Sequence, residues 1–189
     1  MPFRLRQSTS LDPGQLRDFA RVLVRAGYLD RTELEAEVCE AARDYALPDP
    51  GTAARDLVAA ATADVHAEQD SWPAVTDFDR LDAALHQLRA RGVVALPYVD
   101  DHWAATAELE RRDDRGEPVP GIAWFTPPDV WHAVGHGMLE INLWHGDSAN
   151  VAPGDQLLEE VLEVLHGHGL AAHFDEGRIE VGLCWQRRR

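Results

Sequence analysis

The stretch Asp129-Val-Trp-His-Ala-Val-Gly-His-Gly-Met-Leu-Glu-Ile-Asn-Leu-Trp-His-Gly-Asp147 changes its hydrophobic period halfway along, and this change indicates the fold. Residues 129–134 predict a short helical turn, which Gly135 and Gly137 end. Residues 139–144 then alternate apolar and polar side chains, the pattern of a strand with one buried face. The set expected to face the core is Leu139, Ile141 and Leu143, and the opposite set is Glu140, Asn142 and Trp144.

More strands and helices are expected on both sides of this stretch. The expected strands lie at 93–99, 121–125, 171–174 and 178–185, and the expected helices at 101–113 and 156–168. Pro97 argues that the first strand is at an edge or ends early. This order predicts an α+β domain with a mainly antiparallel sheet and with helices packed on one face.

Helical patterns fill the chain before residue 93. Asp12 and Pro13 predict the start of a first helix, Asp30 and Glu33 a capping box for a second, and Ala53 the start of a third. A fourth helix opens at Thr76 with a Leu81, Leu85 and Leu88 stripe and ends at Gly92. We therefore expect a helical N-terminal segment over residues 1–70 and the α+β domain over residues 71–189.

The charge is strongly negative and unevenly distributed. The formal net charge is −15, and residues 71–186 carry 7 Arg against 20 Asp and Glu. Such a surface repels phosphate backbones, so we expect a protein partner with a basic surface rather than nucleic acid. The alternative is that the charge only keeps the chain soluble. All 18 basic residues are Arg, which excludes a catalytic or phosphate-binding lysine.

Neither a signal peptide nor a membrane span is indicated, so a cytoplasmic location is expected. No nucleophile is indicated either. Ser71 and Ser148 lack an elbow motif, and Cys39 and Cys184 lack a basic activator. No catalytic residue, and no cofactor, is therefore expected from the sequence.

A metal site is the alternative prediction. His132 and His136 have the i, i+4 spacing of a helical ligand pair, although no glutamate base lies between them. Asp101 and His102 could join them to form a site for a divalent transition metal such as zinc, and thus a metal-dependent hydrolase. The competing interpretation is that the histidines lie at a helix C-terminus and that Asp101 caps a helix.

Tryptophans suggest a second kind of surface. Trp124, Trp131 and Trp144 lie in or beside the expected sheet, and Glu140 and Asn142 share a strand face with Trp144. Together these five residues predict a shallow recognition surface that combines aromatic and polar side chains. The alternative is that the tryptophans fill the core.

Three segments carry a resemblance to a known family. They are WPAVTDFDRLDAALHQLRARGVVA at 72–95, GIAWFTPPDVWHAVGHGMLEINLWHG at 121–146 and GLAAHFDEGRIEVGLCWQRRR at 169–189. These segments resemble DUF6891, an actinobacterial family of unknown function, and the resemblance implies no activity. Similar sequences tend to carry a cysteine-rich turn after the first strand, where this chain has residues 97–103, PYVDDHW. Thiol or zinc chemistry of such relatives is therefore not transferred to this chain.

These observations together favour a non-catalytic function. We expect an acidic interaction or regulatory protein that binds a partner with a basic surface. A metal-binding protein or metal-dependent hydrolase is the alternative.

Overall fold

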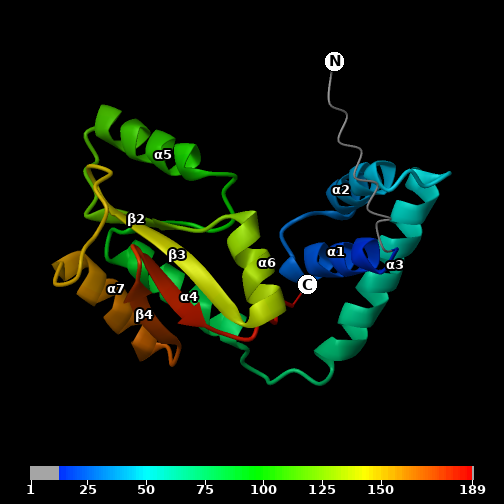
Figure 1. The fold of residues 1–189 in the computed structure, drawn as a ribbon. Coiled ribbons are helices and arrows are strands. Elements are labelled where there is room, and N and C mark those ends of the chain that lie inside the picture. The colour runs from blue at the N-terminus through cyan, green and yellow to red at the C-terminus, as the bar shows by residue number, and fades with distance from the viewer. Residues whose placement is uncertain (1–12, 189) are drawn as a thin grey trace, which may run out of the picture. The chain divides into compact units, whose positions relative to one another are not determined.

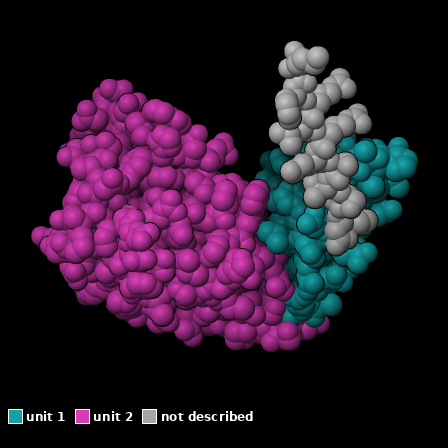
Figure 2. All heavy atoms as spheres, in the orientation of Figure 1, with its two compact units in different colours: residues 1–24, 29–68 teal, residues 25–28, 69–189 magenta. Residues whose placement is uncertain are grey.

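A computed structural model describes residues 13–188, which form two compact units (Figure 2). Unit 1 comprises residues 13–24 and 29–68, and unit 2 comprises residues 25–28 and 69–188. The expected N-cap Asp12 lies outside the described residues. Each unit has its own buried apolar residues, and each is described below by itself.

Unit 1 is helical. Its elements are α1 (Pro13–Ala26, of which residues 25–26 belong to unit 2), α2 (Arg31–Asp44) and α3 (Pro50–Gln69). Asp30 and Glu33 form the predicted capping box of α2, because each side chain accepts a hydrogen bond from the other's backbone N–H. An ion pair of 2.6 Å between Arg21 and Glu68 joins α1 to α3.

Helix α3 begins three residues before its predicted start at Ala53. The cluster Pro48-Asp49-Pro50-Gly51 looks like a helix breaker, but Asp49 Oδ1 accepts a hydrogen bond of 3.0 Å from Thr52 N and Pro50 occupies the first helical position. Proline is favourable there because the first helical N–H has no intrahelical partner. With 20 residues α3 is the longest helix described, yet no helix within residues 13–188 joins the length to the apolar composition that a membrane span needs.

Unit 2 contains a five-stranded sheet and four helices among the residues that the structure describes (Figure 1). Its elements are α4 (Asp77–Ala90), β1 (Val94–Leu96), α5 (His102–Asp114), β2 (Gly121–Trp124), α6 (Pro127–His136), β3 (Met138–His145), α7 (Gln156–Gly167), β4 (Ala171–Asp175) and β5 (Arg178–Gly182). The α+β class predicted from the sequence is confirmed. Strand β1 is short and lies at the sheet edge, as Pro97 predicts.

The sheet is mixed, which corrects the prediction of a mainly antiparallel sheet. The strand order is β1-β2-β3-β5-β4, with β1 parallel to β2 and the other three neighbouring pairs antiparallel. The connection from β1 to β2 passes through α5, and a helical crossover of this length lets two consecutive strands run in the same direction.

Strand β3 is central, and its predicted inward face is confirmed. Leu139, Ile141 and Leu143 are at most 1% exposed and belong to the main core cluster, together with apolar residues of α4, α6 and α7. Helix α6 is longer than the predicted turn at 129–134. It starts after Thr126, whose backbone N–H donates to Asp129, and it ends at Gly137 in the left-handed conformation with φ of 73°.

Helices cover both faces of the sheet, so the prediction that they pack on one face is wrong. Helix α5 lies on the side opposite to α4 and α7 (Figure 1), where Ala105 and Leu109 form a separate cluster with Val94, Ile122 and Trp124. All four residues of β2 are buried because β2 lies between the two layers. This second layer positions the candidate site.

Candidate functional site

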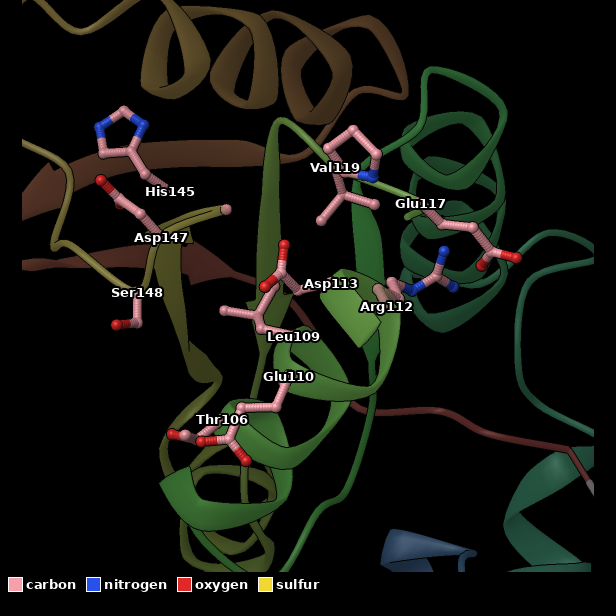
Figure 3. A pocket seen from close by; sticks show the side chains of 12 residues that line it. Thr106, Leu109, Glu110, Arg112, Asp113, Glu117, Val119, His145, Asp147 and Ser148 are labelled. Carbon is pink, nitrogen blue, oxygen red and sulfur yellow. The ribbon is translucent and has the colours of Figure 1, made fainter. Parts of the chain in front are cut away.

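A groove of about 630 Å³ lies along α5 in unit 2 (Figure 3). Its lining comes from α5 (Thr106, Leu109, Glu110, Arg112, Asp113), from the loop after α5 (Glu117, Pro118, Val119), and from the last residue of β3 and the turn after it (His145, Gly146, Asp147, Ser148). We call this set the acidic groove. The antiparallel register that pairs Gly121 with His145 brings the loop before β2 next to the turn after β3.

Helix α5 presents one face to the groove and another to the sheet. Asp101 caps the helix, since its Oδ1 accepts hydrogen bonds from Trp103 N at 2.8 Å and Ala104 N at 3.3 Å. Ala105 is fully buried against the sheet, whereas Glu110 and Asp113 are exposed on the groove side. The helix therefore holds two carboxylates at i, i+3 spacing along one wall.

The groove carries net negative charge, because Arg112, the one arginine in its lining, is paired with a carboxylate outside the lining. Arg112 Nε lies 2.7 Å from Glu108 Oε1, and Arg111 bonds to the same carboxylate. Glu117 pairs with Arg115 at 3.1 Å. The other carboxylates of the lining, Glu110, Asp113 and Asp147, form no ion pair with any part of the chain that the structure describes. Their charge is available to a ligand.

Two hydrogen bonds that one carboxylate accepts fix the turn that closes the groove. Asp155 Oδ2 lies 3.0 Å from His145 Nε2 and accepts a 2.7 Å hydrogen bond from Ala152 N. Because a carboxylate only accepts, Nε2 of His145 carries the hydrogen. The hydrogen bond from His145, followed by that from the Ala152 backbone, holds the pKa of Asp155 below its usual value. Asp155 therefore stabilises the fold in its ionised form.

The low pKa of Asp155 gives a stability prediction that depends on pH. A carboxylate with a depressed folded-state pKa contributes stability above the pKa of the unfolded chain, about 3.9, and loses it as the pH falls through the folded value. We expect Asp155→Asn to unfold at lower urea concentration than the wild type near neutral pH, and the difference to narrow below about pH 4. Urea titrations at several pH values between about 3 and 7, followed by tryptophan fluorescence, measure the difference in stability between the two proteins. A difference that stays constant with pH would show that the carboxylate charge is not involved.

The predicted recognition surface is divided between the two faces of the sheet. Trp124 is 5% exposed beneath α5 and contacts Trp144 edge to face, with ring centroids 5.2 Å apart. Trp131, on α6, packs against the main core cluster instead. Glu140 forms an ion pair with Arg178 of β5, and Asn142 is half-buried opposite Trp124 in the register. The structure brings Trp124, Trp144 and Asn142 together but places Trp131 elsewhere.

The predicted metal ligands come together only in part. The rings of His132 and His136 are neighbours on α6, with centroids 4.6 Å apart, and both are exposed. Asp101 caps α5, as the competing interpretation predicts, and the His102 ring contacts the exposed Trp103. Within residues 13–188 no three His, Cys, Asp or Glu side chains are grouped so that they could hold a metal ion.

The residues of the acidic groove were not predicted as a site. Glu110, Asp113 and Glu117 lie in a stretch rich in both acidic residues and arginine, ELERRDDRGE at 108–117, and mixed charge of this kind is typical of a solvated helix face. Asp147 lies 30 positions after Glu117 and joins this stretch only through the register of β2 and β3.

Comparison with known proteins yields a family and no activity. No curated protein and no solved structure matches the chain significantly. The model of DUF6891, described as a domain of unknown function, matches residues 11–189. Because this match covers both units and confirms the resemblance seen in the sequence, the chain belongs to the DUF6891 family.

Proposed function

We propose that this chain is a non-catalytic interaction protein of the cytoplasm whose acidic groove binds a basic segment of a partner protein. The observation that supports this most is the set of three carboxylates that form no ion pair within residues 13–188, Glu110, Asp113 and Asp147, around one cavity of about 630 Å³. A cationic side chain in the groove would lie between Glu110 and Asp113 of α5 on one wall and Asp147 of the turn after β3 on the other. The proposal requires no cofactor.

The apolar part of the lining favours an arginine or lysine side chain over a small inorganic cation. Leu109, Pro118 and Val119 supply apolar surface between the carboxylates. Long basic side chains bury their methylene stems on such surface while their charged heads reach the carboxylates. A segment with several basic residues would therefore gain both contact area and charge pairing in the acidic groove.

An exposed tryptophan extends the same wall. Trp103 is 66% exposed and precedes Thr106, Glu110 and Asp113 at spacings of 3, 7 and 10 residues, which places all four on one face of α5. Exposed aromatic rings bind guanidinium groups through cation–π contacts and often anchor interfaces. We expect Trp103 to contact the partner segment beyond the end of the groove.

Exposed charges of this kind determine specificity and the rate of association more than affinity. A groove of this size also covers less area than a standard protein interface. We therefore expect transient binding with a dissociation constant in the micromolar range at low salt, of about 10⁻⁶ to 10⁻⁴ M.

The test uses a short fluorescein-labelled peptide that alternates arginine and alanine. Fluorescence anisotropy with the full chain should show saturable binding that weakens by about tenfold between low salt and ~0.5 M sodium chloride, because salt screens exposed charges. The matched control is the same peptide with citrulline, which is neutral and nearly isosteric, in place of arginine. Equal binding of both peptides, or binding that is indifferent to salt, would contradict the proposal.

A further inference from the structure

The C-terminal residues 183–188 of unit 2 are fixed in place by a series of side-chain contacts. The Trp185 indole is 3% exposed and donates a hydrogen bond of 3.2 Å to Ala26 O. Cys184 N donates to Asp77 Oδ2 at 2.9 Å. Gly27 has φ of +81°, and a Cβ at this position would lie 2.9 Å from Arg187 Cδ. The absence of a side chain at Gly27 therefore lets the stem of Arg187 lie against the backbone.

Arg187 is held with its guanidinium over aromatic rings. Its Cζ lies 4.0 Å from the ring centroid of Tyr28 and 5.2 Å from that of Phe78. Tyr28 in turn stacks on Tyr98, with ring centroids 4.2 Å apart and an interplanar angle of 9°. A guanidinium this close to two aromatic rings is held by cation–π attraction.

One donor of this guanidinium is unsatisfied. Arg187 Nη1 is buried and has no hydrogen-bond partner among residues 13–188. Burial raises the pKa of Tyr28 to about 12, so the phenol stays neutral and does not balance the charge of Arg187. A buried donor that lacks a partner is unfavourable, so an acceptor that reached this N–H group would stabilise the guanidinium.

Arg187 is also one of the residues that line a small cavity. Its volume is about 180 Å³, and its lining comprises Tyr28, Phe78, Leu81, Asp82, Leu85, Pro97 and Arg187. The lining is apolar apart from the Arg187 guanidinium, the Tyr28 hydroxyl and the Asp82 carboxylate. Ligand pockets for drug-sized molecules measure about 300–1,000 Å³, so this cavity suits a smaller molecule.

We propose that this cavity binds a small monocarboxylic acid with a short apolar body. The carboxylate would accept hydrogen bonds from the guanidinium of Arg187, whose planar fork matches its two oxygens. The apolar body would lie against Leu81, Leu85 and Pro97. Asp82 adds a negative charge to the lining, so a dicarboxylate should bind more weakly than a monocarboxylate.

The first test uses the wild-type chain with ¹⁵N-labelled arginine and 3-methylbutanoate as the probe. Addition of the probe should produce a saturable shift of the Arg187 side-chain N–H resonance, which is assigned by its loss in Arg187→Gln. The alcohol 3-methylbutanol has the same apolar body and should produce no saturable shift. No saturable shift with the acid at millimolar concentration, or an equal response to the alcohol, would overturn the proposal.

The second test compares two neighbouring arginines by calorimetric titration with 3-methylbutanoate. Arg187→Gln should weaken binding about tenfold or more, the loss expected for a charged hydrogen bond. Arg188→Gln is the matched control, because Arg188 contacts Asp79 and lies outside the lining, and its affinity should stay within about twofold of the wild type. Equal affinity of Arg187→Gln and the wild type would overturn the proposal. If Arg187→Gln is unfolded by circular dichroism, the Arg187 side-chain resonance is assigned by through-bond correlation to its backbone in the ¹³C,¹⁵N-labelled wild type, and its response to the acid and the alcohol decides.

Discussion

A variant with Glu110→Gln, Asp113→Asn, Glu117→Gln and Asp147→Asn is expected to bind the arginine-alanine peptide about thirtyfold more weakly than the wild type. These substitutions neutralise all four carboxylates of the acidic groove while they preserve side-chain size. Exposed ion pairs contribute about 0.2–1 kcal/mol each, so the three carboxylates that form no ion pair within the chain, at about 0.7 kcal/mol each, give about 2 kcal/mol, or a factor of about thirty. Fluorescence anisotropy at low salt measures the change.

The matched control removes the same number of charges from unit 1. Glu37→Gln, Asp44→Asn, Asp56→Asn and Asp64→Asn lie at exposed positions of the helical unit. This variant has the same net charge as the groove variant, so its affinity for the peptide should stay within about threefold of the wild type. Equal weakening in both variants would mean that the peptide responds to the overall charge of the chain and that the groove is not its site.

The second large effect is expected for Gly146→Ala, which should destabilise unit 2 and deform the groove. A Cβ at Gly146 would lie 2.1 Å from Val119 O, far inside contact distance, and the obstacle is backbone that cannot rotate away. The turn after β3 must then separate from the loop before β2, where Gly146 N now donates a 3.2 Å hydrogen bond to Pro120 O. Overpacking of this kind costs about 1–3 kcal/mol.

Urea unfolding measures the effect of Gly146→Ala, and tryptophan fluorescence is a specific probe. All six tryptophans lie between residues 72 and 185, so the signal reports unit 2. The control is Gly135→Ala in α6, where a Cβ meets nothing within 4 Å and alanine favours the helix over glycine by about 1 kcal/mol. Gly135→Ala should unfold at the same or higher urea concentration. A Gly146→Ala protein as stable as the wild type would show that the two segments are not packed as described.

Local signals in the sequence predict most elements of this fold. The alternation in residues 139–144 gives the correct inward face of β3, and the Leu81, Leu85 and Leu88 stripe gives the buried face of α4. These predictions succeed because each buried face repeats with the period of its own element. The capping box of α2 is predicted correctly for a similar reason, since Asp30 and Glu33 are three residues apart.

Predictions that depend on long-range pairing fail. Helix α5 buries little more than Ala105 and Leu109 against the sheet, so it looks like a solvated helix and its layer was missed. One signal was present, because the uninterrupted apolar run GIAWF at 121–125 is typical of a strand that is covered on both faces. The parallel pairing of β1 with β2 was missed for the same reason, because the connection between these two strands passes through α5.

The candidate site was missed for the same physical reason. The acidic groove collects residues from 106–113, 117–119 and 145–148, and only the β2–β3 register brings these segments together. The metal ligands, in contrast, were predicted from local spacing alone. Spacing correctly places His132 beside His136, but it cannot bring Asp101 to them, because the carboxylate of Asp101 is bound to the start of its own helix.

The location of the peptide on the chain is the decisive measurement. Backbone amide resonances of the ¹⁵N-labelled full chain, recorded while the arginine-alanine peptide is added at low salt, identify the residues that it contacts. We expect the perturbed amides to lie at 103–119 and 145–148, in the two walls of the acidic groove and beside Trp103. Perturbations that lie in α1, α2 or α3, or that spread evenly over every acidic surface, would contradict the assignment of the groove as the binding site.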